Sequence, residues 1–325
     1  MRVLVLGANG FIGQAITAYF SRSAGVDLVA AVRCESTAGR IAGVDYRTVD
    51  AMHPAALAEA IRGVSHVVNC VMGSGQTMTR STTGVCEAAL RSGVTRVVHF
   101  SSCAVYGATT GRIDEQTVVA READWYGIAK IACESIAADY ARRGLSNVVF
   151  RPSCIYGPGS EQWTGRIGRL LSSGRLGDLG AAGDGRCNLV YVDDVCAAVL
   201  SALSMPGGGL HTFILSGPSP GTWNDYFLAF ARALGAVPIR RLPGWRLRAE
   251  GKVLAPALKL AQIARSALRA GSVHVPDPLT PSLLRAFELD AAYDGSSAAR
   301  SLGLGWTPLE RGLTDAAAWV ARHAR

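Results

Sequence analysis

Residues 3–13 read VLVLGANGFIG, and this stretch decides the fold class of the chain. The apolar run at its start predicts a buried β-strand, and the residues from position 11 onward predict a helix. Glycines at this spacing allow a tight turn, close approach of the backbone to a pyrophosphate, and close packing of helix on strand. The first helical turn adds free N–H groups and a positive dipole end. We therefore predict a dinucleotide-binding loop formed by Gly7, Asn9, Gly10, Phe11, Ile12 and Gly13.

Outward from this loop, short β-branched runs alternate with helical segments as far as residue 150. This alternation predicts parallel strands in a doubly wound sheet with helices on both faces. The fold class is therefore α/β of the Rossmann type. We expect strands at 3–6, 28–32, 46–49, 66–70, 96–101 and 147–150, and helices at 11–20, 54–61, 82–92 and 126–142.

Beyond residue 150, prolines and glycines interrupt the pattern. Residues 188–192, 193–203 and 212–215 are expected to return to the sheet as strand, helix and strand. We predict a dinucleotide-binding core of residues 1–158 with 188–216. Residues 159–187 with 217–325 should form a smaller, mostly helical substrate-binding lobe.

The composition excludes several classes of protein. Of the 325 residues, 49% are hydrophobic and 18% are charged, which is not the composition of a disordered chain. No apolar run reaches the ~18–20 residues that span a bilayer, and the N-terminal residues lack a signal-peptide pattern. The eight cysteines are scattered without a Cys-x-x-Cys pair. We therefore expect reduced thiols, no metal site and a cytoplasmic location.

Charged residues near the second and third strands indicate the cofactor. Arg33 ends the second strand, where an acid would bind the ribose hydroxyls of NAD and a cation suits the 2′-phosphate of NADP. Arg33, with Arg40 and the hydroxyls of Ser36 and Thr37, favours NADP(H), with NAD as the alternative. Asp50 follows the third strand and is placed either to meet the adenine amino group or to cap the next helix.

A tyrosine and a lysine share one face of a predicted helix. Tyr126 and Lys130 are four residues apart, and the chain has only two other lysines. A phenol titrates near ~10, but a neighbouring ammonium favours the phenolate and makes it a usable base. A serine of the strand end at 101–102 can hold a substrate oxygen in line for proton transfer.

The chain resembles the extended short-chain dehydrogenases/reductases, a group of sugar-nucleotide epimerases, dehydratases, reductases and 3β-hydroxysteroid dehydrogenase-like enzymes. The resemblance implies that Tyr126 is the acid/base, that Lys130 is its pKa partner and a ligand of the cofactor ribose, and that Ser102 binds the reacting oxygen. It also places Pro152 among the cofactor-binding residues. The matching motifs are GANGFIG (7–13), SSCAVYG (101–107), YGIAK (126–130), FRPSCIYGPG (150–159), VYVDDV (190–195) and YDGSSAARSLGLGWTPLERGL (293–313).

Departures from the family pattern bear on the substrate. The 4,6-dehydratases carry Thr-Asp-Glu where this chain has Ser-Cys-Ala at 102–104, which argues against dehydration. Many sugar-nucleotide enzymes bind the diphosphate with an arginine at the position of Cys187, and here Arg186 stands one place earlier. We assign Cys103, Trp163 and Arg186 to substrate binding, with a small packing residue as the alternative for Cys103.

Three functions compete at this stage. The first is an NADP(H)-dependent oxidoreductase or epimerase acting on a secondary alcohol or ketone of a sugar nucleotide. The second is a dehydrogenase for an apolar, sterol- or isoprenoid-like alcohol, favoured by the altered arginine position. The third is a non-catalytic NADP-binding regulator, against which the intact serine, tyrosine and lysine argue. By analogy with the family, we expect a homodimer.

The basic charge is concentrated in one segment. The chain carries a net charge of +8, and residues 236–276 hold a single acid, Glu250. We expect this segment to attract an anionic substrate or cofactor, or to lie on a membrane surface, and we expect no nucleic-acid partner because aromatic residues are not interleaved with the cations. The cations are Arg240, Arg241, Arg246, Arg248, Lys252, Lys259, Arg265 and Arg269.

Overall fold

The computed structural model describes residues 1–34, 40–268 and 276–323, and within 262–268 it describes the backbone alone. The chain divides into two compact units. The first comprises Met1–Ile155, Val190–Gly217 and Tyr293–Trp306, and the second comprises Tyr156–Leu189, Pro218–Ala292 and Thr307–Arg325. The prediction that residues 217–325 all belong to the lobe is wrong for Tyr293–Trp306. This segment is hydrogen-bonded into the first unit, where the Asp294 amide donates to the Ile113 carbonyl at 2.8 Å.

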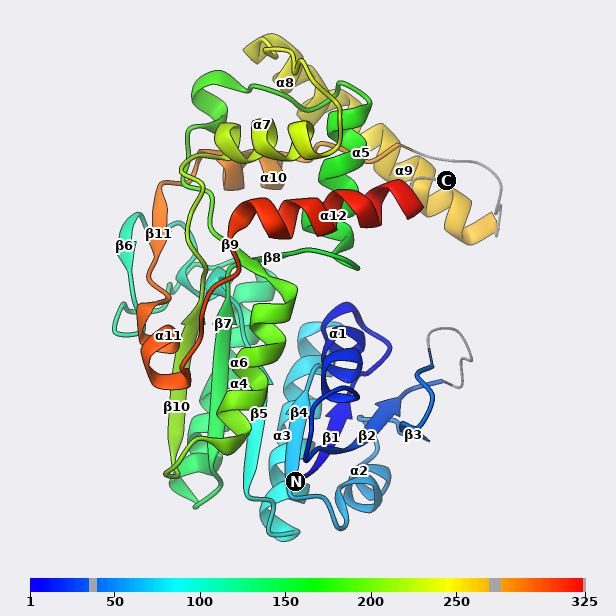
Figure 1. Cartoon of the computed structure of the whole chain (residues 1–325), viewed down its shortest axis with the longest axis vertical. Helices are drawn as coiled ribbons and strands as arrows, with labels where there is room; N and C mark the ends of the chain where they lie inside the picture. The colour runs from blue at the N-terminus through cyan, green and yellow to red at the C-terminus, as the bar shows by residue number, and fades with distance from the viewer. Residues whose placement is uncertain (35–39, 269–275, 324–325) are drawn as a thin grey trace. The chain divides into compact units, whose positions relative to one another are not determined.

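A seven-stranded sheet forms the centre of the first unit (Figure 1). Its strand order is β10-β7-β5-β4-β1-β2-β3, and every neighbouring pair is parallel. This order confirms the doubly wound, Rossmann-type fold. The order reverses between β1 and β4, so ligands are expected beyond the carboxyl ends of these two strands. The strands are β1 (Arg2–Leu6), β2 (Asp27–Val32), β3 (Asp45–Thr48), β4 (His66–Asn69), β5 (Arg96–Phe100), β7 (Asn147–Pro152) and β10 (Leu210–Leu215).

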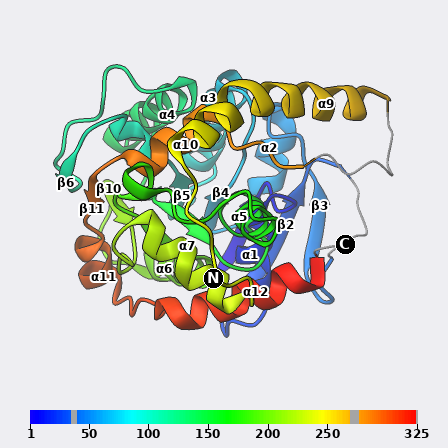
Figure 2. The ribbon, with the colours of Figure 1, turned by 90° about the horizontal axis from the view of Figure 1, so that it is seen from above.

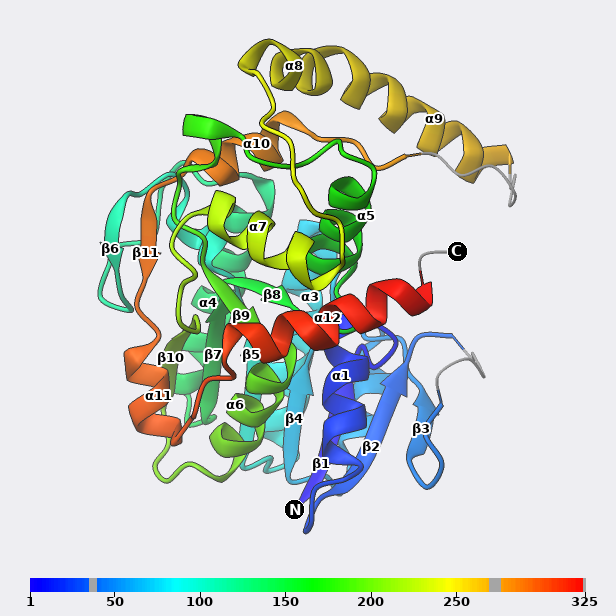
Figure 3. The ribbon, with the colours of Figure 1, turned by 45° about the horizontal axis from the view of Figure 1, so that its top comes forward.

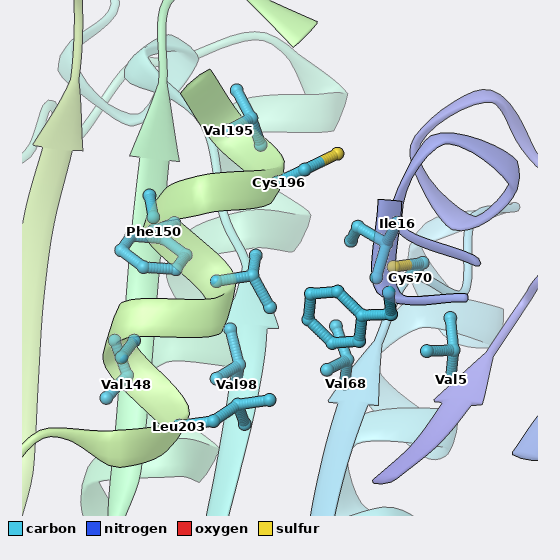
Figure 4. Close-up of a cluster of buried hydrophobic side chains, with 14 of the residues drawn as sticks. Val5, Ile16, Val68, Cys70, Val98, Val148, Phe150, Val195, Cys196 and Leu203 are labelled. Carbon is cyan, nitrogen blue, oxygen red and sulfur yellow. The ribbon is translucent and has the colours of Figure 1, made fainter. Parts of the chain in front are cut away.

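Helices cover both faces of this sheet (Figure 2). Helices α1 (Phe11–Phe20) and α6 (Val192–Ser204) pack on one face. On the other face lie α2 (Pro54–Ile61), α3 (Gly75–Arg91) and α4 (Trp125–Arg142). Figure 4 shows how Ile16 of α1 and Leu203 of α6 meet strand residues such as Val68 and Val98 in the core. The strands are apolar on both faces because both faces are buried in this way.

Two expectations about individual elements are corrected. Helix α3 begins at Gly75 rather than at residue 82, because the Ser74 side chain caps it by accepting a hydrogen bond from the Thr77 amide at 3.1 Å. The first turns of α3 are polar, so the sequence there lacks the apolar repeat that predicts a helix. The segment 188–192 forms only the short strand β9 (Leu189–Tyr191), which lies outside the seven-stranded sheet.

Five further short elements were not predicted from the sequence pattern or lie at the boundaries of the units. They are β6 (Gly111–Ile113), β8 (Cys154–Tyr156), β11 (Ala291–Tyr293), the 3₁₀ turn η1 (Cys103–Tyr106) and helix α11 (Ser296–Leu302). Strands of three residues carry too few side chains to show a period of two.

The second unit is mostly helical. Its core is a cluster of aromatic side chains in which the Trp223 ring lies 4.8 Å from that of Phe287 and the Tyr226 ring lies 5.8 Å from that of Phe230. None of the described helices is both long and apolar enough to cross a bilayer. The helices are η2 (Glu161–Gly165), α5 (Arg166–Ser172), η3 (Gly180–Gly183), α7 (Trp223–Ala233), α8 (Gly244–Ala249), η4 (Glu250–Leu254), α9 (Ala255–Leu268), α10 (Pro281–Glu288) and α12 (Leu309–His323).

Candidate active site

The loop between β1 and α1 is shaped by its glycines. Gly7 has φ +77°, in the left-handed region, and a Cβ on it would lie 2.9 Å from the Cys70 carbonyl oxygen at the end of β4. A Cβ on Gly13 would collide with the carbonyl oxygen of Gly7. Only glycine therefore allows the backbone to turn this closely between β1 and α1. The loop lies where the strand order reverses.

The first turn of α1 leaves its N–H groups available for an anion. The N-cap is Gly10, so no side chain caps the helix, and the Gly10 amide itself donates to the Gly7 carbonyl at 3.0 Å. The amides of Phe11 and Ile12 belong to the set that has no acceptor within a helix. Asn9 is exposed, and its carbonyl accepts from Gln14 Nε2 at 2.9 Å. Free N–H groups at a helix N-terminus are the donors that a pyrophosphate needs, and binding of a pyrophosphate here stays the prediction made from the sequence.

The residues predicted to select the cofactor follow β2 and β3. Arg33 is exposed directly after β2, and the guanidinium of Arg40 lies 5.1 Å from the centroid of the Tyr46 ring in β3. Ser36 and Thr37 lie outside the described residues. Asp50 is exposed, and its carboxylate accepts from the Met52 amide at 2.9 Å.

The alternative role of Asp50 as a helix cap is wrong. Helix α2 begins three residues later than that role requires, with His53 at its N-cap position. Asp50 instead closes a turn ahead of the helix, since the Met52 amide donates to its carboxylate at 2.9 Å and the His53 amide donates to its carbonyl at 3.0 Å. The carboxylate remains at the carboxyl end of the sheet, in the position predicted for adenine binding.

The structure brings Ser102, Tyr126 and Lys130 together. Ser102 lies just beyond β5, where its hydroxyl accepts from the Ala104 amide at 3.1 Å and interacts with the Tyr126 phenol so as to lower its pKa. Lys130 lies one turn further along α4, with its Nζ 5.5 Å from the centroid of the Tyr126 ring. The helix is started by Asp124, whose carboxylate accepts from the Gly127 amide at 2.8 Å.

Burial controls the electrostatics of this group. Burial raises the pKa of the Tyr126 phenol, and the hydrogen bond with Ser102 only partly offsets that rise. Burial also lowers the pKa of the Lys130 ammonium, which is 3% exposed and donates to the Phe100 carbonyl at 2.6 Å. The phenol therefore holds its proton at neutral pH, and the serine hydroxyl is placed to orient an oxygen beside it.

A second polar network, which the sequence analysis missed, supports the same helix. Glu134, four residues after Lys130, accepts from the Ser101 hydroxyl and from both Nε and Nη2 of Arg151 at 2.9 and 2.6 Å. Nη1 of Arg151 donates to the Tyr106 hydroxyl at 2.8 Å. Burial lowers the pKa of the Arg151 guanidinium, but the hydrogen bond to the Glu134 carboxylate and the other interactions with Glu134 and Tyr106 together outweigh that effect. The pKa of Arg151 is therefore raised. Glu134 lies four residues after Lys130, and this spacing could have indicated from the sequence that both side chains share one face of the helix.

Cys103 is corrected from a substrate-binding residue to a packing residue. It is 4% exposed, its thiol donates to the Arg151 carbonyl at 3.3 Å, and burial raises its pKa well above the ordinary value. This burial and the bond to the Arg151 backbone favour the alternative role of Cys103 as a small packing residue. Pro152 ends β7 at the carboxyl edge of the sheet, opposite Leu215 of β10.

Trp163 and Arg186 belong to the second unit. The Trp163 ring stacks on the Trp223 ring, with the two centroids 5.3 Å apart. The backbone carbonyl of Trp163 accepts a hydrogen bond from the Tyr226 hydroxyl at 2.7 Å. Nε of Arg186 lies 3.5 Å from the Asp290 carboxylate, with about half of the Arg186 side chain exposed. Cys187, at the position of the family's diphosphate-binding arginine, is fully buried.

Comparison with known proteins decides the family. Residues 3–215 match the NAD dependent epimerase/dehydratase family. The chain belongs to this family. The match covers the glycine loop, the strand end with Ser102, and Tyr126 with Lys130, and it confirms the resemblance read from the motifs. The protein is accordingly an NAD(P)-dependent oxidoreductase or epimerase.

Two curated relatives align with most of the chain. A 2-alkyl-3-oxoalkanoate reductase from Stenotrophomonas maltophilia is 25% identical over 292 residues, covering 84% of this chain and 82% of the relative. A 3β-hydroxysteroid-dehydrogenase/decarboxylase from Arabidopsis thaliana is 24% identical over 249 residues, covering 72% of this chain and 55% of the relative.

Solved structures share the fold over the whole chain. The UDP-glucose 4-epimerase of Thermotoga maritima, solved with UDP-glucose, superposes with a TM-score of 0.75 at 17% identity and covers all of both chains. The UDP-glucuronic acid 4-epimerase of Bacillus cereus, solved with NAD, has a TM-score of 0.71 at 17% identity, with 99% and 97% of the two chains covered. At this level of identity the likeness concerns the fold.

Proposed function

We propose that this protein interconverts a secondary alcohol and a ketone with NADP(H), using Ser102, Tyr126 and Lys130. The observation that carries the proposal is the position of the Lys130 ammonium, 5.5 Å from the centroid of the Tyr126 ring, with Ser102 close enough to lower the pKa of the same phenol. Carbonyl reduction needs a proton donor, a hydroxyl that binds the carbonyl oxygen and a cation that stabilises the phenolate. Tyr126, Ser102 and Lys130 would supply these three groups.

The three residues divide the work of proton transfer. When bound, NADPH would supply the hydride that reduction adds to the carbonyl carbon, and NADP would accept that hydride in oxidation. The Ser102 hydroxyl donates a hydrogen bond to the carbonyl oxygen and orients it, and the Tyr126 phenol transfers its proton to that oxygen. The Lys130 ammonium stabilises the phenolate that remains. In oxidation the Tyr126 phenolate takes up the alcohol proton.

The choice of NADP(H) over NAD(H) rests on Arg33. This guanidinium is exposed at the carboxyl end of β2, the position from which a side chain meets the adenosine ribose in this fold. A guanidinium at that point forms charge-assisted hydrogen bonds with a 2′-phosphate. No acidic residue ends β2 to accept the hydroxyls of an unphosphorylated ribose.

For the substrate we favour a ketone or alcohol with apolar substituents. Cys187 is fully buried where sugar-nucleotide enzymes carry the arginine that binds the diphosphate, and Arg186 beside it faces Asp290. The two curated relatives are named for a 2-alkyl-3-oxoalkanoate and a 3β-hydroxysteroid, whose alkyl and steroid parts are apolar. These observations move the apolar substrate ahead of the sugar nucleotide that the motifs first favoured.

A sugar nucleotide is the second candidate substrate, because Arg186 could bind its diphosphate. Arg186 is paired with Asp290, an exposed acid. The Asp290 side chain is 73% exposed, so a diphosphate can displace it from the guanidinium at little cost. In that case the same three residues would serve a 4-epimerase or a net oxidoreductase.

The resemblance further implies a homodimer formed through α3 and α4. Trp125 and Ile128 on α4 are 65% and 53% exposed, which supports a contact on that helix.

The test compares substrates and one matched pair of variants. Wild type is incubated with NADPH and a 2-alkyl-3-oxoalkanoate, with NADP and a 3β-hydroxysteroid, and with UDP-glucose, and turnover is followed by cofactor absorbance and by product analysis. We expect turnover of an apolar substrate, and a loss of at least ~100-fold in kcat for Tyr126→Phe with little change in cofactor affinity.

Tyr140→Phe is the matched control, since Tyr140 is a buried tyrosine of the same helix. It should keep wild-type kcat. Turnover confined to UDP-glucose would select the second candidate, and retention of activity within about tenfold in Tyr126→Phe would remove Tyr126 from the mechanism.

A further inference from the structure

Helices α8, η4 and α9 form one continuous helical arm of the second unit (Figure 3). We call residues 244–261, whose side chains are described, the basic arm. Leu247, Gly251 and Ala255 are buried and hold one side of the arm against the rest of the unit. The other side faces solvent.

The solvent face of the basic arm carries large apolar side chains. Trp245 is 66% exposed, Val253 is 71% exposed and Leu260 is 68% exposed. Their spacing of eight and then seven residues places them along one stripe of a helix. Single exposed apolar residues are common, but a stripe of three on one arm is the kind of surface through which proteins bind membranes or other proteins.

Cations flank this stripe and no acid accompanies them. Arg248, Lys252 and Lys259 are exposed, and their spacing of four and seven residues forms a second stripe. The one acid of the arm, Glu250, is buried and paired with Arg175 at 2.7 Å. Within residues 244–261 the exposed charge is therefore entirely positive.

We propose that the basic arm docks on the surface of an anionic lipid bilayer. Helices with an apolar stripe beside lysines and arginines lie in the bilayer interface, with the apolar side chains below the headgroups and the cations at the anionic phosphates. Tryptophan prefers this depth because its ring is apolar and its N–H is polar. The charge pattern argues against a second copy of the chain as the partner of this face. Two basic arms facing each other would repel.

The experiment measures binding of the full chain to vesicles. Sedimentation is compared for phosphatidylcholine vesicles and for vesicles containing roughly one-third phosphatidylglycerol. We expect binding to the anionic vesicles that weakens with salt and is at least about tenfold weaker to phosphatidylcholine alone. The double variant Lys252→Glu/Lys259→Glu should lose at least about tenfold in partition coefficient.

Matched controls separate the arm from the general charge of the protein. Arg62→Glu/Arg91→Glu reverses two cations that are 76% and 77% exposed, one directly after α2 and one at the end of α3, and it should leave vesicle binding within about twofold of wild type. Val253→Ser should weaken binding, whereas Val118→Ser, at a valine 83% exposed in the first unit, should not.

Four results would overturn the proposal. They are the absence of binding to the anionic vesicles, equal losses in the arm and control variants, duplex DNA binding that competes equally with the vesicles, and self-association that the arm variants abolish. None of these depends on turnover, so the proposal stands or falls separately from the proposed function.

Discussion

The Glu134 carboxylate accepts two hydrogen bonds from the Arg151 guanidinium, at 2.9 and 2.6 Å. Glu134 lies one turn after Lys130 on α4, and Arg151 lies in β7, so this ion pair ties the helix that carries Tyr126 to the central sheet. The Glu134 and Arg151 side chains are only 15% and 9% exposed. Removal of the carboxylate would leave a buried guanidinium without its counter-charge.

We expect Glu134→Gln to lower the free energy of unfolding by about 3 kcal/mol, because an uncompensated buried charge is costly. It should also lower kcat more than it raises KM, since the Ser101 hydroxyl that donates to Glu134 immediately precedes Ser102. Urea denaturation and steady-state kinetics measure the two effects.

An exposed ion pair provides the control for this variant. Glu87 pairs with Arg91 on α3, where the two side chains are 43% and 77% exposed. Glu87→Gln should change the free energy of unfolding by less than about 0.5 kcal/mol. Equal losses in the two variants would contradict a special role for the Glu134–Arg151 pair.

The direction of reaction should depend on pH through Tyr126. Burial raises the pKa of this phenol, so it is protonated through the neutral range, as the proposed role of proton donor requires. We expect kcat/KM for reduction to be flat near neutral pH and to fall in alkaline solution, and kcat/KM for oxidation to rise with pH because oxidation needs the phenolate. A reduction rate that increases with pH would count against Tyr126 as the proton donor.

Arg33 should determine the preference for the 2′-phosphate. Wild type is expected to bind NADPH at least tenfold more tightly than NADH, about 1.4 kcal/mol, and Arg33→Asp should reverse that order. Fluorescence titration with both cofactors gives the four dissociation constants. Arg62→Asp, at an exposed arginine that ends α2, should bind both cofactors as wild type does. Equal affinities in wild type would show that Arg33 does not meet the ribose.

His99 should make the fold sensitive to acid. Burial lowers the pKa of His99 to about 4, whereas the unfolded chain takes up this proton near pH ~6.5. The unfolded state thus binds more protons between these values, and stability falls as pH falls through that range. Between about pH 7.5 and about pH 5 the contribution is about 2 kcal/mol, which His99→Gln should remove. Chemical denaturation of both proteins at the two pH values checks this, and an unchanged pH dependence would exclude His99 as the cause.

Local pattern was sufficient for much of the fold and for the proposed catalytic pair. Seven of the eight expected strands join the central sheet, and the helices at 11–20, 54–61, 126–142 and 193–203 appear where the periods predicted them, with small shifts at the ends. The glycine loop and the Tyr126–Lys130 spacing could be read directly, because a turn and a helix face depend on residues only a few positions apart.

Contacts between distant residues required the tertiary structure. The Arg151 guanidinium meets Glu134 across 17 positions and Tyr106 across 45, and no spacing rule connects residues so far apart. The burial of Cys103 and the membership of Tyr293–Trp306 in the first unit likewise depend on which elements pack together. The sequence by itself determined the order of strands and helices and the glycine turn after β1, and it placed the residues proposed for proton transfer on one helix face, since these follow from local backbone geometry. Only the tertiary structure decided which charges are paired and which side chains are enclosed, because burial and ion pairing arise when separate elements exclude water between them.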